Sequence, residues 1–165
     1  MKMPGQSVRT CDRCLGQTKS GGRCSKRVCM GDYCWIHAQN QLGLRVKDSA
    51  IRQAGKGLYA TKNFKSGDTI AKYKGECMSR EEIDRRYPGD TNADYGFCAG
   101  RNCVDAIRTN DGFARYANHK PWRQASAKIT GRRCDTFRLQ AIKNIRADKK
   151  NPAEIFADYG PDYIL

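Results

Sequence analysis

The N-terminal part of the chain is rich in cysteine and poor in large apolar residues, and this combination constrains its fold more than any other feature. Five of the nine cysteines lie between Cys11 and Cys34. Residues 1–42 could not bury enough apolar surface to stay folded alone. A secreted protein would use so many cysteines in disulfides, but their crowding at one end favours a bound metal, which would supply much of the folding free energy.

The spacing within this stretch suits zinc, which takes four ligands in structural sites. Three thiolates and one imidazole come from Cys14, Cys24, Cys34 and His37. A rival set with Cys11 in place of Cys24 stays open from the spacing alone. We favour the first set because residues 14–24, followed by 33–37, resemble a small Cys3His zinc module. Cys11 and Cys29 are then left over.

Length and charge bound the class of protein. The chain has 165 residues, enough for one ordinary domain and a small appendage. It has no apolar run long enough to span a bilayer, and residues 1–10 lack the apolar stretch of a secretory signal, so we expect a soluble, intracellular protein. Its formal charge of +14 favours nucleic acid or chromatin as surroundings.

The pattern changes after residue 42, so we expect a zinc-binding module at 1–42 and a second domain at 43–165. Apolar alternation between glycine-rich turns predicts short strands at 44–47, 58–60, 70–73, 95–99, 103–107 and 137–141. Ser79 and Glu82 form a capping box, which predicts a helix at 80–87 that stops at Pro88. The mixture favours a mostly β (α+β) domain of several small antiparallel sheets.

Four short motifs follow one another in this second domain. They occupy residues 55–60, 73–76, 112–119 and 154–160. In order and spacing they resemble the SET domain, the catalytic fold of protein lysine methyltransferases, over residues 43–163. The resemblance implies a pseudoknot, in which 115–119 passes beneath the segment ending in Tyr159, and S-adenosylmethionine as cofactor. In its compactness the chain is similar to the minimal SET proteins of large DNA viruses.

The resemblance also implies a cofactor site, residue by residue. The Asn118 amide would bind the amino-acid portion of S-adenosylmethionine, and the His119 backbone would bind the adenine. The remaining contacts would come from Tyr95, Arg115, Tyr116 and the backbone of Lys56, Gly57 and Leu58. A metal-ligand or general-base role for His119 is disfavoured, because no second histidine or cysteine lies at chelating spacing.

Methyl transfer to lysine needs a collinear arrangement and an uncharged amine, although free lysine has a pKa near ~10.4. A narrow apolar channel lined by tyrosines meets both needs, since desolvation disfavours the ammonium form. The resemblance puts Tyr159 at the channel floor and Tyr73 and Tyr163 along its walls. The substrate peptide would add as a strand beside residues 95–98.

The chain departs from the family pattern in three places. Lys120 and Pro121 follow His119, where serine and cysteine are common. Residues 147–153 are longer and more basic than the usual Gly-Glu-Glu turn, so that Glu154 is its only match. The cysteine-rich post-SET segment is missing, which leaves residues 162–165 to close the channel.

Two functions are consistent with these observations. The first is a lysine methyltransferase acting on a basic protein tail, most plausibly a histone, in the nucleus or on chromatin, with the zinc module guiding it there. The second is a non-catalytic chromatin or nucleic-acid binding protein on a SET scaffold. Retention of Asn118 and Tyr159 favours the first function. The sequence leaves oligomeric state open.

Overall fold

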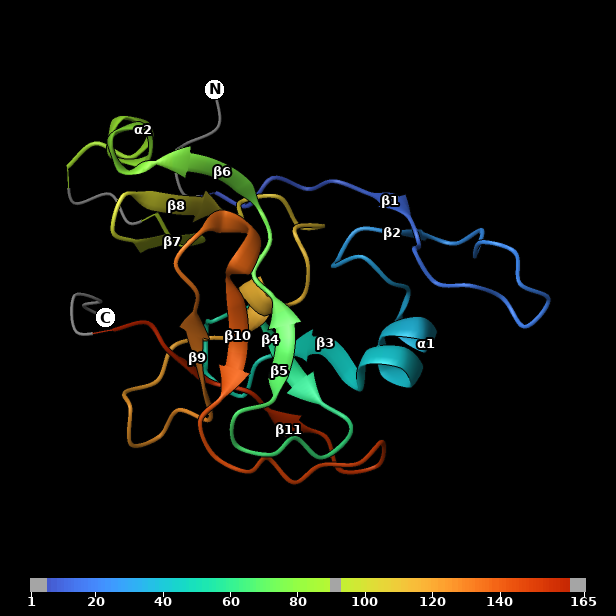
Figure 1. The fold of residues 1–165 in the computed structure, drawn as a ribbon. Coiled ribbons are helices and arrows are strands. Elements are labelled where there is room, and N and C mark those ends of the chain that lie inside the picture. Colours follow the sequence, from blue (N-terminus) through green and yellow to red (C-terminus); the bar gives the residue numbers. More distant parts are fainter. Residues whose placement is uncertain (1–5, 90–92, 161–165) are drawn as a thin grey trace.

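The computed structural model describes residues 6–89 and 93–160. In this part of the chain, short strands form four small sheets, joined by loops and a few short helices (Figure 1). The small cysteine-rich module lies at one side, where β1, β2 and α1 are labelled, and the remaining sheets lie together beside it.

The module has one two-stranded sheet, built from β1 (Asp12–Arg13) and β2 (Arg27–Val28). The second domain has two three-stranded sheets and one four-stranded sheet. The first comprises β11 (Ala153–Glu154), β4 (Lys56–Ala60) and β3 (Leu44–Asp48). The second comprises β6 (Glu76–Ser79), β8 (Asn102–Asp105) and β7 (Gly96–Ala99). The third comprises β12 (Ala157–Asp158), β9 (Ala127–Thr130), β10 (Arg138–Ala141) and β5 (Thr69–Lys72).

The helical segments are short. They are α1 (Trp35–His37), η1 (Ala38–Leu42), α2 (Arg80–Arg86), η2 (Ala114–Tyr116) and η3 (Cys134–Thr136). Helix α2 begins at the predicted capping box: the Glu82 N–H donates to the Ser79 Oγ at 3.1 Å, and the Ser79 N–H donates to the Glu82 carboxylate at 2.7 Å. These two bonds satisfy donors that a helix N-terminus otherwise leaves free.

All six predicted strands are present, with ends shifted by one or two residues. The alternation in β10 is also confirmed, because Leu139 and Ala141 are buried while their neighbours are half-exposed. No element was predicted for the boundary segment 38–43. It continues α1 as a π-helix, which ends where Gly43 adopts a left-handed conformation with φ of 69°. Glycine suits this position because it has no Cβ to strain the backbone.

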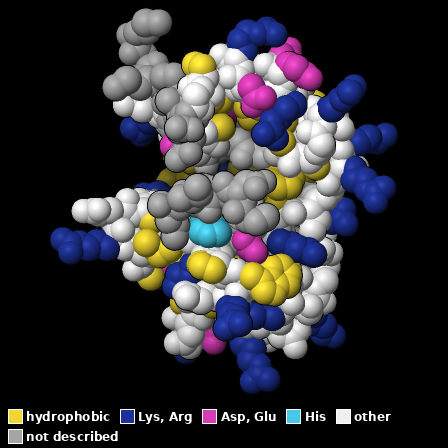
Figure 2. All heavy atoms as spheres, turned by 90° about the vertical axis from the view of Figure 1, so that its left-hand side faces the viewer, with side chains coloured by type: hydrophobic (Ala, Val, Ile, Leu, Met, Phe, Trp, Pro, Cys, Tyr) yellow, Lys and Arg dark blue, Asp and Glu magenta, His cyan; other side chains and the backbone are white. Residues whose placement is uncertain are grey.

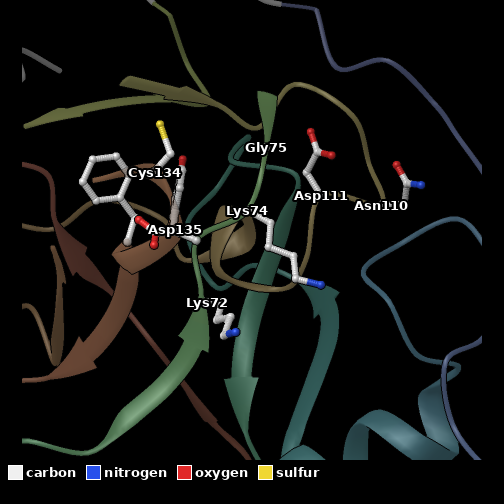
Figure 3. Close-up of a pocket in the computed structure, with 9 residues that line it drawn as sticks. Lys72, Lys74, Gly75, Asn110, Asp111, Cys134 and Asp135 are labelled. Carbon is white, nitrogen blue, oxygen red and sulfur yellow. The ribbon is translucent and has the colours of Figure 1, made fainter. Parts of the chain in front are cut away.

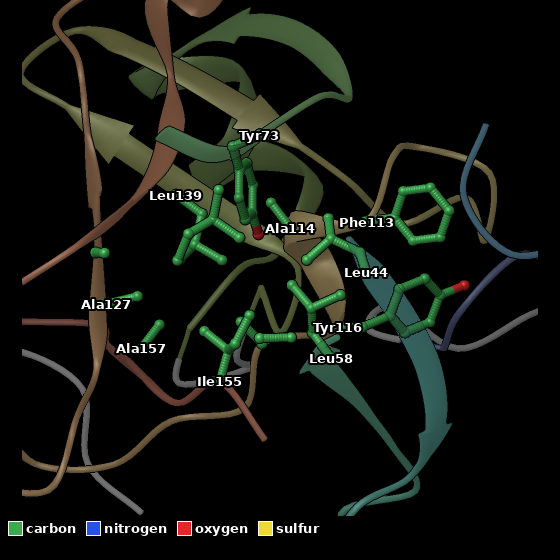
Figure 4. Close-up of a cluster of buried hydrophobic side chains, with 14 of the residues drawn as sticks. Leu44, Leu58, Tyr73, Phe113, Ala114, Tyr116, Ala127, Leu139, Ile155 and Ala157 are labelled. Atoms are coloured by element: carbon green, nitrogen blue, oxygen red, sulfur yellow. The ribbon is translucent and has the colours of Figure 1, made fainter. Parts of the chain in front are cut away.

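The main core of the second domain is a cluster of apolar side chains from all three of its sheets (Figure 4), and a smaller cluster lies between α2 and the β6–β8 pair. Leu44, Leu58, Leu139 and Ile155 are fully buried within the main cluster. A separate small cluster in the module contains three cysteines and Val28. The half-buried Tyr33 packs against the main cluster and the module cluster and so joins the two parts.

The module is also hydrogen-bonded to the loop that precedes η2. The Val8 N–H donates to the Ile107 carbonyl at 2.9 Å, and the Gly31 N–H donates to the Thr109 carbonyl at 3.0 Å. An ion pair of 2.6 Å joins the Lys74 ammonium to the Asp32 carboxylate. A Cβ on Gly31 would lie 2.6 Å from the Phe113 ring, so the close approach of the two parts requires glycine there.

The cysteines left over from the zinc set are paired in disulfides. Cys11 bonds to Cys29 within the module, and two further pairs, Cys77–Cys134 and Cys98–Cys103, stabilise the second domain. This result corrects the interpretation of Cys11 and Cys29 as spare. Among the described helices, none has the length and apolar character needed to cross a membrane.

We predict that Leu139→Ala lowers the free energy of unfolding by about 2–5 kcal/mol, because it opens a cavity in the centre of β10. Leu139 is fully buried, whereas Leu15 is 49% exposed, so Leu15→Ala serves as the matched control and should change stability by less than about 0.5 kcal/mol. Urea denaturation of both variants measures the difference. Equal losses of stability would contradict the assignment of Leu139 to the core.

Candidate functional site

Two segments far apart in sequence run side by side at the centre of the site. The Ala157 N–H donates to the Asn118 carbonyl at 2.9 Å, and the Lys120 N–H donates to the Ala157 carbonyl at 3.0 Å. His119 and Ala157 thereby form a parallel bridge. On its other side β12 pairs in parallel with β9. The C-terminal strand therefore lies between the 118–120 segment and a sheet, as expected for the pseudoknot.

Tyr159 is fixed to the same segment by three contacts. Its hydroxyl donates to the Ala117 carbonyl at 2.5 Å, and its N–H donates to the His119 Nδ1 at 3.2 Å. The centroids of the His119 and Tyr159 rings lie 5.2 Å apart. The candidate catalytic tyrosine and the two candidate cofactor residues, Asn118 and His119, therefore form one compact group.

Asn118 connects this group to the start of β4, because its Nδ2 donates to the Lys56 carbonyl at 3.0 Å. The neighbouring Gly57 lies under Glu154, whose carboxylate would be 2.3 Å from a Cβ at that position. Leu58 belongs to the core: its side chain is fully buried, and its carbonyl accepts the Ile155 N–H at 2.8 Å. Lys56 and Gly57 thus lie beside the group of Asn118, His119 and Tyr159, while Leu58 packs in the core next to it.

Glu154 holds the Gly57 turn through three hydrogen bonds. Its carboxylate accepts from the Ser49 hydroxyl at 2.6 Å, the Ala50 N–H at 2.8 Å and the Tyr59 hydroxyl at 2.9 Å. Burial, together with the Glu154 carboxylate, raises the pKa of Tyr59 to about 12. Sequence reasoning gave Glu154 no role, because its partners lie about a hundred residues away along the chain.

A second group surrounds Arg115, which is only 5% exposed. Its guanidinium carbon lies 4.0 Å from the Tyr95 ring centroid and 5.0 Å from that of Tyr116, in cation–π geometry. Its Nη2 donates to the Ser7 hydroxyl at 2.9 Å, while Nε and Nη1 have no hydrogen-bond partner among the described residues. These two donors suit a ligand that brings acceptor oxygens.

Tyr73 joins this second group to the segment that leads into β7. Its hydroxyl donates to the Tyr95 carbonyl at 3.0 Å, directly before β7. Burial raises the pKa of Tyr73 well above its ordinary value, and burial likewise raises that of Tyr116 to about 12. Both phenols are therefore neutral hydrogen-bonding groups at physiological pH. Tyr163 lies outside the described residues.

A cavity of about 460 Å³ opens beside Tyr73 (Figure 3). Its lining carries both signs of charge, from Lys72 and Lys74 and from Asp111 and Asp135. Burial raises the pKa of Asp111. Because Asn118, His119 and Tyr159 do not line this cavity, it is separate from the group around the pseudoknot.

The four predicted zinc ligands meet in the module. The ligand atoms of Cys14, Cys24, Cys34 and His37 all lie within 4.8 Å of one another. His37 Nδ1 is 3.4 Å from the Cys14 sulfur and 3.3 Å from the Cys34 sulfur. Such separations match neighbouring corners of a zinc tetrahedron, given Zn–S bonds of about 2.3 Å and Zn–N bonds of about 2.0 Å. Cys11 is bonded to Cys29, which removes it from the rival set.

The surroundings of Cys14 favour its thiolate form. Burial raises the pKa of its thiol, but N–H groups of Cys34 at 3.1 Å and Gly16 at 3.3 Å donate to the sulfur, and the net result is a pKa of about 7. A Cβ at Gly16 would lie 2.3 Å from the His37 ring, so glycine is needed for the imidazole to reach the cluster. Thiolates and imidazole in this arrangement fit a structural Zn²⁺ ion.

The family model of the SET domain matches residues 55–160. Similar solved structures include ctPRC2 in complex with H3K27me3, at 26% identity and a TM-score of 0.60 over 74% of this chain and 15% of that one. The Chaetomium thermophilum polycomb repressive complex 2 matches at 27% identity and a TM-score of 0.57, over 73% of this chain and 15% of that one. The fold is also similar to the Neurospora SET domain protein DIM-5, a histone lysine methyltransferase. The identity is 24% and the TM-score 0.56, over 74% of this chain and 54% of that one.

This chain thus spans only 15% of the polycomb chains it matches. No curated protein sequence matches it. The matched family model, however, covers well over half of the chain, and its ends coincide with the Gly55 turn and with the residue after Tyr159. The chain belongs to the SET domain family.

Proposed function

We propose that this protein is an S-adenosylmethionine-dependent protein lysine methyltransferase. The observation that carries the proposal is the convergence of Tyr159, Asn118 and His119 at the paired segments, with Lys56 bonded to Asn118. The family supplies the reaction class, and the retained geometry supports activity over a scaffold that has lost turnover.

The residues around the pseudoknot fit the cofactor. The Asn118 amide and the turn at 56–57 would hold its amino-acid portion and nucleoside, and the unpaired donors of Arg115 suit its carboxylate. When bound, S-adenosylmethionine supplies a methyl group on a positive sulfur, which keeps the bonding electron pair when the lysine nitrogen takes the methyl.

The chain itself must hold the target amine neutral and in line. Tyr73 is almost fully buried, and Phe97 lies 6.1 Å from its ring, so this wall excludes water and disfavours an ammonium ion. The Tyr159 hydroxyl, held at the Ala117 carbonyl, is placed to orient the amine through a hydrogen bond. Together these residues would lower the pKa of the target ammonium, so that its proton leaves to solvent before transfer, and would position the neutral nitrogen.

The substrate would bind along β7, which is one of the two outer strands of its sheet among the described strands. An extended peptide can pair with the free edge of such a strand. On the face that contains β7 and β9, Lys and Arg side chains gather around the rim and hydrophobic side chains lie nearer the middle (Figure 2). Since ctPRC2 was solved in complex with H3K27me3, we propose a histone tail as substrate.

We further propose that the module binds zinc and that the protein acts on chromatin in the nucleus. A reducing compartment would convert all three disulfides of this structure to thiols, whereas the zinc cluster would persist there because it needs no oxidation. Incubation with labelled S-adenosylmethionine and core histones, followed by mass spectrometry, tests the activity. Tight cofactor binding without label on any lysine would favour the non-catalytic alternative.

Tyr159→Phe should lower methyl transfer by about 100-fold or more while S-adenosylmethionine affinity changes little, because the lost hydroxyl orients the amine and contributes little to holding the cofactor. Single-turnover rates and cofactor titration measure the two effects separately. Tyr33→Phe, a matched change in the module, should leave both unchanged. Undiminished turnover in the Tyr159 variant would exclude this residue from catalysis.

Purified protein should hold one zinc ion per chain. Cys24→Ser should lower zinc affinity by more than the roughly 10–100-fold that loss of an outer partner costs, and should disorder the module while the second domain keeps its own unfolding transition. Cys29→Ser is the matched control, because Cys29 lies in the disulfide and should leave the zinc content intact. Full zinc retention by the Cys24 variant would overturn the ligand assignment.

A further inference from the structure

A groove of about 250 Å³ lies between the module and the second domain, away from the candidate methyl-transfer residues. One wall is formed by residues 26–30 and 33–35 of the module. The other is formed by Arg45 and Val46 of β3 and by Phe113. The groove is thus built from both parts of the chain, which the hydrogen bonds at Thr109 hold in place.

The lining of the groove combines aromatic rings with positive charge. The aromatic members are Tyr33, Trp35 and Phe113, and the cationic members are Lys26, Arg27 and Arg45. No lining residue is acidic, and none of the three cations takes part in a salt bridge among the described residues. Both features favour an anionic ligand with flat apolar groups.

Trp35 is the most unusual of these residues. Its side chain is 65% exposed, although it follows the buried Cys34, and tryptophan at a surface normally packs against a neighbour. Met30, at 40% exposed, adds apolar surface to the same groove. An indole with an open face beside lysine and arginine is the arrangement on which unpaired bases stack while their phosphates meet the cations.

We propose that this groove binds unpaired nucleotides of a single-stranded nucleic acid, with a base stacked on Trp35 and the phosphates beside Lys26, Arg27 and Arg45. An acidic peptide would satisfy the cations but would leave the indole face without a matching ring. Paired bases of a duplex could not reach the groove floor without leaving the helix. The proposal is independent of methyl transfer, so Tyr159→Phe should bind the same oligonucleotide with unchanged affinity.

The two tryptophans of the chain allow a direct optical test on the zinc-loaded full chain. In Trp122→Phe, Trp35 is the sole indole, and titration with oligothymidylate should quench its emission. In Trp35→Phe, the emission of Trp122 should stay constant. Trp122 is a matched control because it is also exposed, at 56%, and has a lysine ammonium 5.9 Å from its ring.

Affinity measurements with fluorescently labelled oligothymidylate give a second readout. Trp35→Ala should weaken binding by about 5- to 150-fold, the loss that removing one stacked base produces, and Trp122→Ala by less than twofold. Arg27→Gln should reduce the slope of log affinity against log salt by about 0.7, since it removes one phosphate contact. Zinc content and circular dichroism of each variant establish that the module is folded.

Three results would overturn the proposal. Trp35 emission that is unaffected by oligothymidylate excludes stacking, even if Trp35→Ala fails to fold. Equal affinity for a duplex of the same length, insensitive to Trp35→Ala, would reduce the interaction to general attraction of phosphates. Displacement of the oligonucleotide by an equal charge concentration of oligoglutamate would assign the groove to an acidic peptide.

Discussion

The candidate site depends on the hydrogen-bonded pairing of residues 118–120 with Ala157. Two short bonds between backbone groups bring the end of the chain against a segment about forty residues earlier. These bonds between backbone atoms fix Asn118 and Lys120 against Ala157, and the side-chain contacts of His119 and Tyr159 then hold the tyrosine beside them. Loss of this pairing would separate the candidate catalytic tyrosine from the candidate cofactor residues.

Small side chains make the crossing sterically feasible. Ala157 pairs with Ala127 of β9, and both are fully buried where three backbone segments meet. Ala117, which accepts the Tyr159 hydroxyl, is also buried. Larger residues at these positions would overpack the core, at a cost of about 1–3 kcal/mol each. The alanines of the motif are therefore structural requirements of the site rather than neutral spacers.

Local patterns in the sequence predicted the elements whose causes are local. The capping box at Ser79 and the alternation in β10 depend on neighbours within a few residues, and both expectations are confirmed. The strands β6 and β9 were not predicted: Glu76–Ser79 lacks a clear alternation, and Ala127–Thr130 alternates over only four residues, so that both depend on pairing with other strands. The same reason hides Glu154, whose three partners are brought to it only by the fold.

The candidate zinc ligands could be predicted only in part from the sequence. Spacing limited them to two sets, and only the fold shows that Cys24 joins the cluster while Cys11 pairs with Cys29. The resemblance to a known module favoured the set that the fold brings together, in which the Cys24 sulfur lies within 4.8 Å of the other three ligand atoms.

The positive charge of the chain affects how it would meet a basic substrate. At +14, the protein repels a basic histone tail at long range, so encounter between the two is slowed by their own fields. A polyanion would reverse this repulsion, because nucleic acid would attract both the proposed enzyme and the basic tail and concentrate them along one backbone. The proposed nucleic-acid groove between the module and the second domain would therefore serve the proposed methyl transfer without touching the reacting atoms. It would raise the local concentration of a substrate whose charge otherwise opposes binding.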